Sequence, residues 1–542
     1  MAKLAADIQL KADVLVIGGG PAGTWAAITA ASRGAKVILA DKGYCGSSGA
    51  TAPSGTGVWY VKPDANLRAE AKASRYNLGG RLAEHRWMDR VLDRTFSNMN
   101  YLSEVGYPFP KDDQGEPYKR GLQGPEYMRL MRKLVKKAGV KILDHSPVLE
   151  LLVDEYGVGG ASGVHIQTND TWTVQAGAVV IATGGCAFLS KALGCNVLTG
   201  DGYLLAAETG AELSGMEFSN AYAISPTFSS VTKTAYYSYA NFYYEDGSPV
   251  EGAGSKSGRS IIARKLQEGR QVYAKLDQAP EEIQQLLRVN QTNFFLPFDR
   301  KGINPFTELF PVTLRLEGTV RGTGGIRIVD ETCATSVPGL YAAGDAATRE
   351  LICGGFTGGG SHNAAWAMSS GSFAGEGASA YVKKLGVHGV DRNLRSASTA
   401  QHIDRIDGAS ALATANKTEE IVRAVQAEVA PYNKNLFRTD ATLKASLQQL
   451  DQLWTEQRNS TVVEPSALGM KAREAMAMTA TARWMYNSAL ARTETRGMHK
   501  REDHKALDEN QRYRLVSSGL DSIKVRPEQV SDEHLVKEGE AV

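Results

Sequence analysis

The chain has 542 residues, of which 42% are hydrophobic and 22% are charged, and its formal net charge is +2. One hydrophobic core does not extend over such a length, so we expect roughly two to four domains. The small net charge provides no overall attraction to nucleic acid or to an anionic membrane. Residues 1–13 lack the apolar core of a signal peptide and no apolar run is long enough to cross a bilayer, so we expect a cytoplasmic protein without a transmembrane segment.

The cysteines are scattered along the chain, and none stands in a C-x-x-C pair. They are Cys45, Cys186, Cys195, Cys333 and Cys353. Their odd number and irregular spacing argue against a disulfide framework. The same pattern argues against a zinc site or an iron–sulfur cluster held by this chain alone, so we expect no metal site.

A glycine-rich turn, Gly18-Gly19-Gly20-Pro21-Ala22-Gly23, lies between the apolar run 14–17 and the alanine-rich stretch 24–33. The run is typical of a buried parallel strand, and the stretch is typical of a helix that ends at Gly34. Backbone amides at a helix N-terminus bind phosphate, and glycine permits both the tight turn and the close approach of a ligand. The turn therefore indicates a dinucleotide site.

The residues after the turn strengthen this interpretation. A second predicted strand, 36–40, ends at Asp41, where a carboxylate can accept hydrogen bonds from a ribose. The following loop, 43–57, has mostly small side chains and suits close wrapping around a ligand, with a solvated linker as the alternative.

The predicted elements then alternate between helices and strands. Residues 64–140 show helical spacing of apolar residues, and a small strand meander follows at 148–153, 163–166 and 172–174. The apolar strand 178–182 leads into Thr183-Gly184-Gly185, at the end of a strand where ligands of open α/β sheets bind. Gly200-Asp201-Gly202 precedes an alanine-rich helix.

The middle of the chain has a different character. Residues 214–328 include the tyrosine-rich segment 236–244 and lack the strand and helix alternation, which returns at a predicted strand ending in Gly344-Asp345. A second domain inserted into the first is the simplest account, because a site between two domains can exclude water. A glycine-rich loop, 352–363, then leads into a helix predicted from Ala364 to Tyr381.

We therefore expect an α/β fold with a discontinuous, Rossmann-like nucleotide-binding domain, an inserted α+β capping domain and a C-terminal helical domain. The expected boundaries are 1–213 and 329–396 for the two parts of the nucleotide-binding domain, 214–328 for the capping domain, 397–506 for the helical domain and 507–542 for a charged tail. The tail is sparse in apolar residues, so we expect it to be extended, or ordered only against a partner.

Together these features resemble the flavoproteins of the fumarate reductase and succinate dehydrogenase superfamily, over nearly the whole chain. The run 494–503, ETRGMHKRED, is similar to the C-terminal E-[ST]-R-G-x-H-x-R-E-D run of that family. The resemblance implies FAD as the dinucleotide, so the nucleotide-binding domain is expected to be an FAD-binding domain. Arg496, His499 and Arg501 are expected to join the helical domain to it.

The resemblance also implies a set of FAD-binding residues. The set is Gly18, Gly20, Pro21, Ala22, Gly23, Asp41, Lys42, Ser47, Ser48, Gly55, Val148, Ala182, Thr183, Gly184, Asp201, Gly344, Asp345, Ser361 and His362. The glycine turn would hold the pyrophosphate, Asp41 the adenosine ribose, and Val148 the adenine through its backbone. Ser47, Ser48 and Gly55 would line the flavin, which Asp201 and Asp345 would contact through its side chain. The amides of Ser361 and His362 would face the isoalloxazine carbonyl.

Three departures from the family pattern matter for the chemistry. Members with covalent flavin carry a histidine where this chain has Gly49, so we expect non-covalent FAD. Dicarboxylate enzymes carry an arginine in an N-R-L-G-G-N-S run, and Phe356 aligns with it here. Their H-P-T and R-G-E-G-G segments are also missing. Because a dicarboxylate site needs several cations, we expect a different substrate.

One branch of the superfamily is more similar. Ser361-His362-Asn363 together with 369–377 is similar to the S-H-K-F-S-S-G-S-x-x-E-G-R stretch of adenylylsulfate reductase α subunits, with three or four extra residues between the two parts. Thr495-Arg496-Gly497 is similar to their E-T-R run. We therefore expect this branch to be the nearest.

Three residues are candidates for catalysis. His362 is the one histidine in a glycine-rich, ligand-facing loop and could act as an acid or base, although it could contribute only its amide. Arg321 could hold an anionic substrate or the charge of the reduced flavin, or be a surface residue. Tyr243, with its neighbours in the tyrosine-rich segment, could stack on a planar substrate or donate a proton, or be a half-buried strand residue.

We therefore expect an FAD-dependent oxidoreductase that moves a hydride or electron pair between flavin N5 and a small, non-dicarboxylate substrate under the cap. Without a cluster motif, its electrons would pass through a ferredoxin-like or other electron-transfer partner, a soluble carrier or O2. We also expect an oligomer that does not bind nucleic acid. One alternative is an electron-transfer subunit in a complex with an iron–sulfur partner. Another is a ring-compound dehydrogenase that uses the cap tyrosines.

Overall fold

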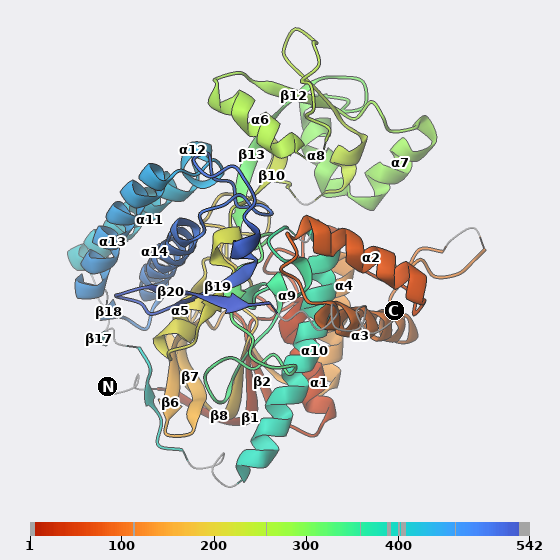
Figure 1. Cartoon of the computed structure of the whole chain (residues 1–542). Coiled ribbons are helices and arrows are strands. Elements are labelled where there is room, and N and C mark those ends of the chain that lie inside the picture. The colour runs from red at the N-terminus through yellow and green to blue at the C-terminus, as the bar shows by residue number, and fades with distance from the viewer. Residues whose placement is uncertain are drawn as a thin grey trace, which may run out of the picture.

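The computed structural model describes residues 6–530 apart from 112–113, 233, 256, 358, 387–391, 399–400, 403–407 and 461. It has a large domain built on a mixed sheet, here called the sheet domain. Above it lies a smaller domain with its own sheet, the cap, and a group of helices packs against its side (Figure 1).

An eight-stranded sheet forms the centre of the sheet domain. Its order is β16-β6-β7-β8-β1-β2-β5, and β15 also pairs with β8. The strands are β1 (Ile8–Ile17), β2 (Val37–Ala40), β5 (Lys141–Leu143), β6 (Val148–Asp154), β7 (Gly157–His165), β8 (Asp170–Ile181), β15 (Leu340–Ala342) and β16 (Arg395–Ser396). Strands β1, β2, β5, β8 and β15 are parallel, whereas β6 and β7 are antiparallel to their neighbours. The two strands predicted at 172–174 and 178–182 form one strand, β8, because its pairing with β1 extends from Trp172 to Ile181.

Two long helices cover one face of this sheet. They are α1 (Pro21–Ser32) and α10 (Gly359–Leu385). Glycines in α10 allow the close approach, since a Cβ on Gly371 would lie 2.3 Å from the carbonyl oxygen of Ala22. The prediction that this helix begins at Ala364 is wrong, and Ser361 and His362 lie in its first turn. Gly360 permits the earlier start, because a Cβ there would lie 2.7 Å from Thr56 Oγ1.

Further elements of the sheet domain lie around this core. They are β3 (Gly55–Gly57), β4 (Gly121–Gln123), α2 (Ala65–Leu78), α3 (His85–Glu104), α4 (Gly124–Lys137), α5 (Asp201–Glu208), η3 (Gly344–Ala346) and α9 (Glu350–Cys353). Strands β3 and β4 pair with each other, so the end of the glycine-rich loop 43–57 is held by a segment more than 60 residues further along the chain.

The cap is built on a four-stranded antiparallel sheet in the order β10-β13-β12-β11. Its elements are β10 (Ala221–Pro226), η2 (Tyr236–Tyr239), β11 (Asn241–Tyr243), α6 (Gly258–Gln267), β12 (Val272–Lys275), α7 (Glu281–Asn290), α8 (Thr292–Lys301) and β13 (Phe310–Gly318). Phe294, Phe298 and Phe310 are buried and pack ring against ring in the cap core. The cap therefore has a hydrophobic core of its own.

The helical part follows the sheet domain in the chain. Its elements are β17 (Gln401–His402), α11 (Gly408–Val429), α12 (Tyr432–Asn435), α13 (Asp440–Ser460), β18 (Val462–Val463) and α14 (Ala467–Ala491). Helix α14 is the central one, since most of its side chains are buried between α11, α13 and the sheet domain.

The expectation of an extended tail beyond Leu507 is wrong as far as residue 530. After η5 (Glu509–Gln511), strands β19 (Tyr513–Ser518) and β20 (Lys524–Gln529) form a hairpin, which pairs with β9 (Leu213–Ser214) in a sheet that also includes β14 (Gly325–Ile326). Strand β19 buries Leu515 and Val516. Two apolar side chains and a paired edge are sufficient to order a segment whose overall composition is polar. The remaining residues of the expected tail, 531–542, lie outside the described residues.

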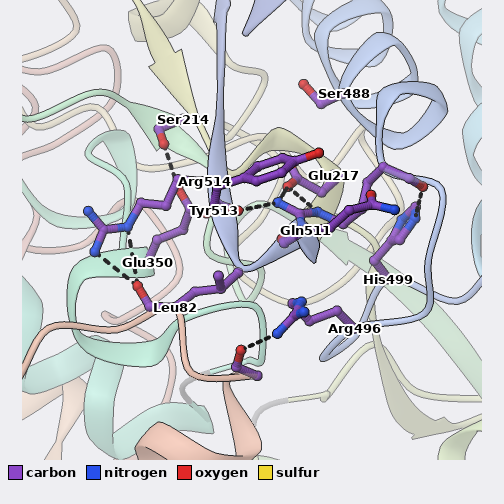
Figure 2. Close-up of polar contacts among 12 residues, drawn as sticks. Leu82, Ser214, Glu217, Glu350, Ser488, Arg496, His499, Gln511, Tyr513 and Arg514 are labelled. Atoms are coloured by element: carbon purple, nitrogen blue, oxygen red, sulfur yellow. Dashed lines mark hydrogen bonds and ion pairs between the residues drawn. The ribbon is translucent and has the colours of Figure 1, made fainter. Parts of the chain in front are cut away.

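A cluster of buried charges joins the C-terminal segment to the sheet domain (Figure 2). Glu217, on η1 (Met216–Phe218), pairs with Arg492 at 2.8 Å, and both side chains are fully buried. Arg496 pairs with Glu494 and donates a hydrogen bond of 2.5 Å to the carbonyl oxygen of Gly80. The expected contact between Arg496 and the sheet domain is therefore confirmed.

Candidate functional site

A cavity of about 760 Å³ extends from the glycine turn, at the carboxyl ends of the parallel strands, to the underside of the cap. Many residues predicted from the sequence line it. They are Gly18, Gly20, Pro21, Ala22, Asp41, Lys42, Ser48, Gly55, Val148, Ala182, Thr183, Gly184, Asp201, Arg321, Gly344, Asp345 and Ser361. The structure thus brings together residues that lie more than 300 positions apart in the chain.

The glycine turn has the geometry of a phosphate cradle. Gly18 has φ +106°, and a Cβ there would lie 2.3 Å from the carbonyl oxygen of Ala182. A Cβ on Gly23 would lie 1.8 Å from the carbonyl oxygen of Gly18, so Gly23 permits close packing within the turn. It does not line the cavity. Gly20 caps α1 and faces open space. An anion can therefore approach the backbone at the positive end of this helix.

Asp41 connects the turn to the loop that follows it. Its carboxylate accepts hydrogen bonds from the Gly19 amide at 2.6 Å, the Gly43 amide at 2.8 Å and the Ser48 hydroxyl at 2.8 Å. The residue is 7% exposed and still lines the cavity. Asp41 therefore shapes the site in addition to offering oxygen to a ligand, a role that the sequence pattern did not reveal. Ser47 does not line the cavity.

Lys42 neutralises the acidic side of the cavity. Its Nζ lies 2.6 Å from Asp201 Oδ2 and 2.8 Å from Glu474 Oε1, and the ammonium group is largely buried. Burial alone would lower the pKa of Lys42, but the two carboxylates together raise it above its usual range. The ammonium group therefore stays charged, and the charge of Asp201 is balanced within the protein.

The side chain of His362 lies against the protein and does not line the cavity. Its Nε2 accepts a hydrogen bond of 3.2 Å from Arg75, and its ring lies 4.5 Å from the ring of Trp59. It is 7% exposed. The position of His362 corrects the expectation of a catalytic imidazole, because its ring is held by neighbours, whereas Ser361 beside it lines the cavity.

Tyr243 also lies away from the cavity. Its hydroxyl donates a hydrogen bond of 2.6 Å to Asp277 Oδ2, and this bond raises the pKa of the phenol. Two other aromatic residues of the same segment, Tyr237 and Phe242, line the cavity instead. The segment turns through a 3-10 helix before β11, so the spacing did not reveal which rings point inward. Tyr243 is therefore not placed to act on a bound molecule.

Two arginines lie at the cap end of the cavity. Arg321, on the segment returning from β13, lines the cavity and lies 3.4 Å from Glu317 Oε2, whose side chain is fully buried. Arg259, on α6, was not predicted, although the glycine-rich stretch before this helix resembles the other ligand-facing segments. Loss of solvation, together with the positive charge of Arg321, lowers the pKa of Arg259 to about 10. This end of the cavity is therefore electropositive.

No group of three or more His, Cys, Asp or Glu residues in the described part of the chain is placed to hold a metal ion. The five cysteines are buried, and no disulfide bond joins any two of them. Among the helices within the described ranges, none is both long enough and apolar enough to span a bilayer.

Family comparisons agree with this architecture. A model of the FAD binding domain matches residues 13–227, and a model of the fumarate reductase flavoprotein C-terminus matches residues 425–540. The two ranges together cover more than half of the chain. The chain belongs to the fumarate reductase and succinate dehydrogenase flavoprotein family. This flavoprotein is an FAD-dependent oxidoreductase, and its glycine cradle fits a diphosphate.

Individual relatives span nearly the whole flavoprotein. An uncharacterized FAD-dependent oxidoreductase of Methanocaldococcus jannaschii is 26% identical over 94% of this chain and 97% of its own length. One subunit of the CoM/CoB fumarate reductase of Methanothermobacter marburgensis is 24% identical over 91% of this chain and 94% of its own.

Solved structures show the same fold at lower identity. A quinol-fumarate reductase has a TM-score of 0.79 at 20% identity, covering 96% of this chain and 98% of its own. Adenylylsulfate reductase from Archaeoglobus fulgidus has a TM-score of 0.76 at 18% identity, covering 98% of each chain. These values show that the flavoprotein shares the fold of both proteins, and they do not place the adenylylsulfate reductase branch nearer.

Proposed function

We propose that this flavoprotein transfers a hydride or an electron pair between FAD and a small substrate with a single anionic group, bound under the cap. The observation that carries the proposal is one continuous cavity with a phosphate cradle at one end and Arg259 and Arg321 at the other. FAD supplies the two-electron chemistry through N5 of its isoalloxazine ring. The protein supplies binding, orientation and electrostatics.

The charges in the cavity favour one anionic group over two. The basic residues among its described lining residues are Lys42, Arg259 and Arg321. Lys42 is balanced by Asp201 and Glu474, and Glu317 lies beside Arg321. Phe356, which aligns with the arginine of the dicarboxylate enzymes, lines the cavity without adding a charge. Arg259, Arg321 and Glu317 together leave one net positive charge at the cap end of the cavity. This charge suits one carboxylate or a comparable anion.

Three kinds of side chain would act on the substrate. The guanidinium groups of Arg259 and Arg321 would bind the anionic group, and their fork geometry would orient it. Tyr237 and Phe242 would contact its apolar part. For the cofactor, we propose that the turn 18–23 binds the diphosphate and that Val148 marks the adenine end, because both line the cavity at the edge of the central sheet, where β1 ends and β6 begins.

An anaerobic reoxidation assay tests the proposal. Photoreduced protein containing FAD is mixed with unsaturated monocarboxylates, with fumarate and with oxidised sulfur anions, and the return of flavin absorbance is followed. We expect at least one monoanion to oxidise the flavin faster than fumarate does. Arg259→Met and Arg321→Met should slow that reaction about tenfold or more and retain FAD.

Arg270→Met provides the matched control. Arg270 is an exposed arginine of the cap that lies over the ring of Tyr244 and does not line the cavity. Its loss should leave the rate unchanged. If fumarate is the fastest oxidant, or if all three variants behave alike, the proposed substrate class is wrong.

A second candidate is an electron-transfer subunit of a larger assembly. Several relatives are described as subunits, among them the Methanothermobacter marburgensis protein and a fumarate reductase flavoprotein subunit of Mycobacterium tuberculosis. This candidate predicts that the isolated flavoprotein oxidises no substrate and that tagged protein co-purifies with an iron–sulfur protein, visible by its absorbance. Turnover by the isolated chain with a soluble electron carrier would exclude it.

A further inference from the structure

The guanidinium group of Arg349 is fully buried between the cavity wall and the segment that returns from the cap. On one side it lies 2.6 Å from Asp345 Oδ1, and Asp345 lines the cavity. On the other side its Nη2 donates to the carbonyl oxygen of Thr319 at 2.6 Å, to that of Gly322 and, at 3.4 Å, to that of Val320. One cation thus holds three carbonyls of a single turn, 319–322.

The return turn, defined here as residues 319–323, carries Arg321. Other contacts attach it to the sheet domain as well. The Arg349 amide donates to the Thr323 carbonyl at 2.7 Å, and the Asn363 side chain donates to the Val320 carbonyl at 3.0 Å. The Thr319 hydroxyl accepts a hydrogen bond of 2.6 Å from the Cys186 amide. The turn is therefore fixed to the sheet domain, although it directly follows the cap strand β13.

We propose that Arg349 is a positioning residue that sets the place of Arg321 at the edge of the cavity. This inference rests on the proposed function, in which Arg321 binds the anionic group of the substrate. Arg259 lies on cap helix α6, so the two arginines of the anion site belong to different domains. Arg349 holds Arg321 in a fixed position relative to Asp345, which forms part of the cavity wall.

The chemistry of the side chain supports this role. A guanidinium group presents donors on two sides of a plane, so it can reach Asp345 and the return turn at once, whereas an ammonium group is a point charge. Removing this buried cation also takes one hydrogen-bond donor away from Asp345 and from the carbonyl oxygens of Thr319 and Gly322. The return turn would then shift or solvate, and Arg321 would move with it.

Sulfite serves as the test anion, because it adds reversibly to N5 of oxidised flavin and bleaches its absorbance. Its affinity is measured on the FAD-loaded wild type, on Arg321→Met, on Arg349→Met and on the double variant. We expect each single variant to bind sulfite about tenfold more weakly or worse. The double variant should bind no more weakly than the weaker single one, because both changes act through Arg321. Effects that multiply in the double variant would overturn the proposal.

Arg392→Met provides the matched control. Arg392 is also fully buried, pairs with Asp154 and donates to the carbonyl oxygens of Gly157 and Val158, but it lies outside the cavity. Its loss should leave sulfite affinity unchanged. Arg349→Lys keeps the positive charge but not the fork of donors. It replaces Arg349→Met in the set of variants if Arg349→Met does not fold. We expect it to lose sulfite affinity as well, but to a smaller extent.

Hydrogen–deuterium exchange of the same variants separates this inference from the proposed function. Arg349→Met should raise exchange at residues 319–323, whereas Arg392→Met should not. If Arg321→Met leaves sulfite affinity unchanged, the proposed anion site is wrong, and exchange alone decides the positioning role. Unchanged exchange at 319–323 in Arg349→Met overturns that role.

Discussion

Gly20 is the glycine of the turn whose missing side chain leaves open space. The other three, Gly18, Gly19 and Gly23, each have protein atoms within 3 Å of an added Cβ, whereas Gly20 has none within 4 Å. Its backbone, with φ −74° and ψ −171°, also suits any residue. The open space beside Gly20 leaves room for the diphosphate that we propose binds at this turn.

Gly20→Ala should leave the stability of the apoprotein unchanged and weaken FAD binding about tenfold or more, because the methyl group would occupy space that the diphosphate needs. Thermal unfolding of the apoprotein and FAD titration by fluorescence measure the two effects. Gly254→Ala is the matched control, since Gly254 also lines the cavity with open space around it, but on the cap side. Equal losses of FAD affinity in both variants would contradict the assignment.

Glu350 is a buried carboxylate with an incomplete set of partners. Ser214 donates to Oε2 at 2.5 Å, as Figure 2 shows, and Oε1 has no hydrogen-bond partner. Burial and the nearby charge of Glu217 raise the pKa of Glu350 from 4.5 to about 7, although Arg514 and Arg492 oppose this shift. The folded protein therefore retains a proton that the unfolded chain releases.

The resulting pH dependence has a definite sign. The stabilisation from protonated Glu350 is complete below about pH 4.5 and is lost as the pH rises toward 7, because the unfolded chain ionises first. Glu350→Gln should therefore reduce the decline in unfolding free energy over this range. Urea unfolding of the apoprotein at several pH values measures it, with Glu70→Gln on the exposed side of α2 as the control. An unchanged slope in Glu350→Gln would contradict the shifted pKa.

At the scale of elements, the β19–β20 hairpin attaches the C-terminal segment to the sheet domain. Arg514 on β19 is 5% exposed, donates to the Leu82 carbonyl oxygen at 2.9 Å and pairs with Glu84 at 2.7 Å. These contacts attach the hairpin to the start of α3. A segment near the C-terminus thereby stabilises the region that follows α2.

Arg514→Met should lower the unfolding free energy by about 3 kcal/mol, because it leaves Glu84 and the Leu82 carbonyl without their partner in a nearly dry setting. Arg526→Met on the same hairpin should change it by no more than about 0.5 kcal/mol, since Arg526 is half-exposed and pairs with Glu212 at the surface. Denaturant unfolding of the holoprotein compares the two. Similar costs for both variants would show that the hairpin contact is not a main source of stability.

Elements with strong local signals could be predicted from the sequence. The strand, glycine turn and helix around Gly18 follow one another within 20 residues as an apolar run, glycines and an alanine-rich stretch, so the sequence pattern was sufficient. The start of α10 could not be predicted, because it depends on the packing of Gly360 against Thr56, far away in the chain. The hairpin depends in the same way on its pairing with β9.

At the scale of the whole molecule, one cavity contains the regions that we propose for cofactor and substrate, and its described lining residues include neither His nor Cys. These are two common attachment points for covalent flavin, and Gly49 lies at the position expected for the histidine. Acid precipitation should therefore release all of the FAD into the supernatant, where its absorbance is measured. Flavin fluorescence retained in the washed pellet would contradict this prediction.

The arrangement of the domains also explains which site residues could be predicted from the sequence. Residues of the cofactor end follow strand ends in the sequence, where the position of a ligand is a property of the fold. Arg259 and Tyr237 belong to the cap, and whether they face the cavity depends on how the cap lies over the sheet domain. His362 had the right neighbours in sequence, yet the helical start of α10 turns its ring toward Arg75 and Trp59.

The insertion of the cap into the sheet domain also has a consequence for biosynthesis. The cavity residues Gly344 and Asp345, on η3, and Ser361, in the first turn of α10, leave the ribosome only after the entire cap has been made. Domains fold largely in the order of their synthesis. The cap can therefore form its own core before Gly344, Asp345 and Ser361 have been made, and the cavity is complete only after them.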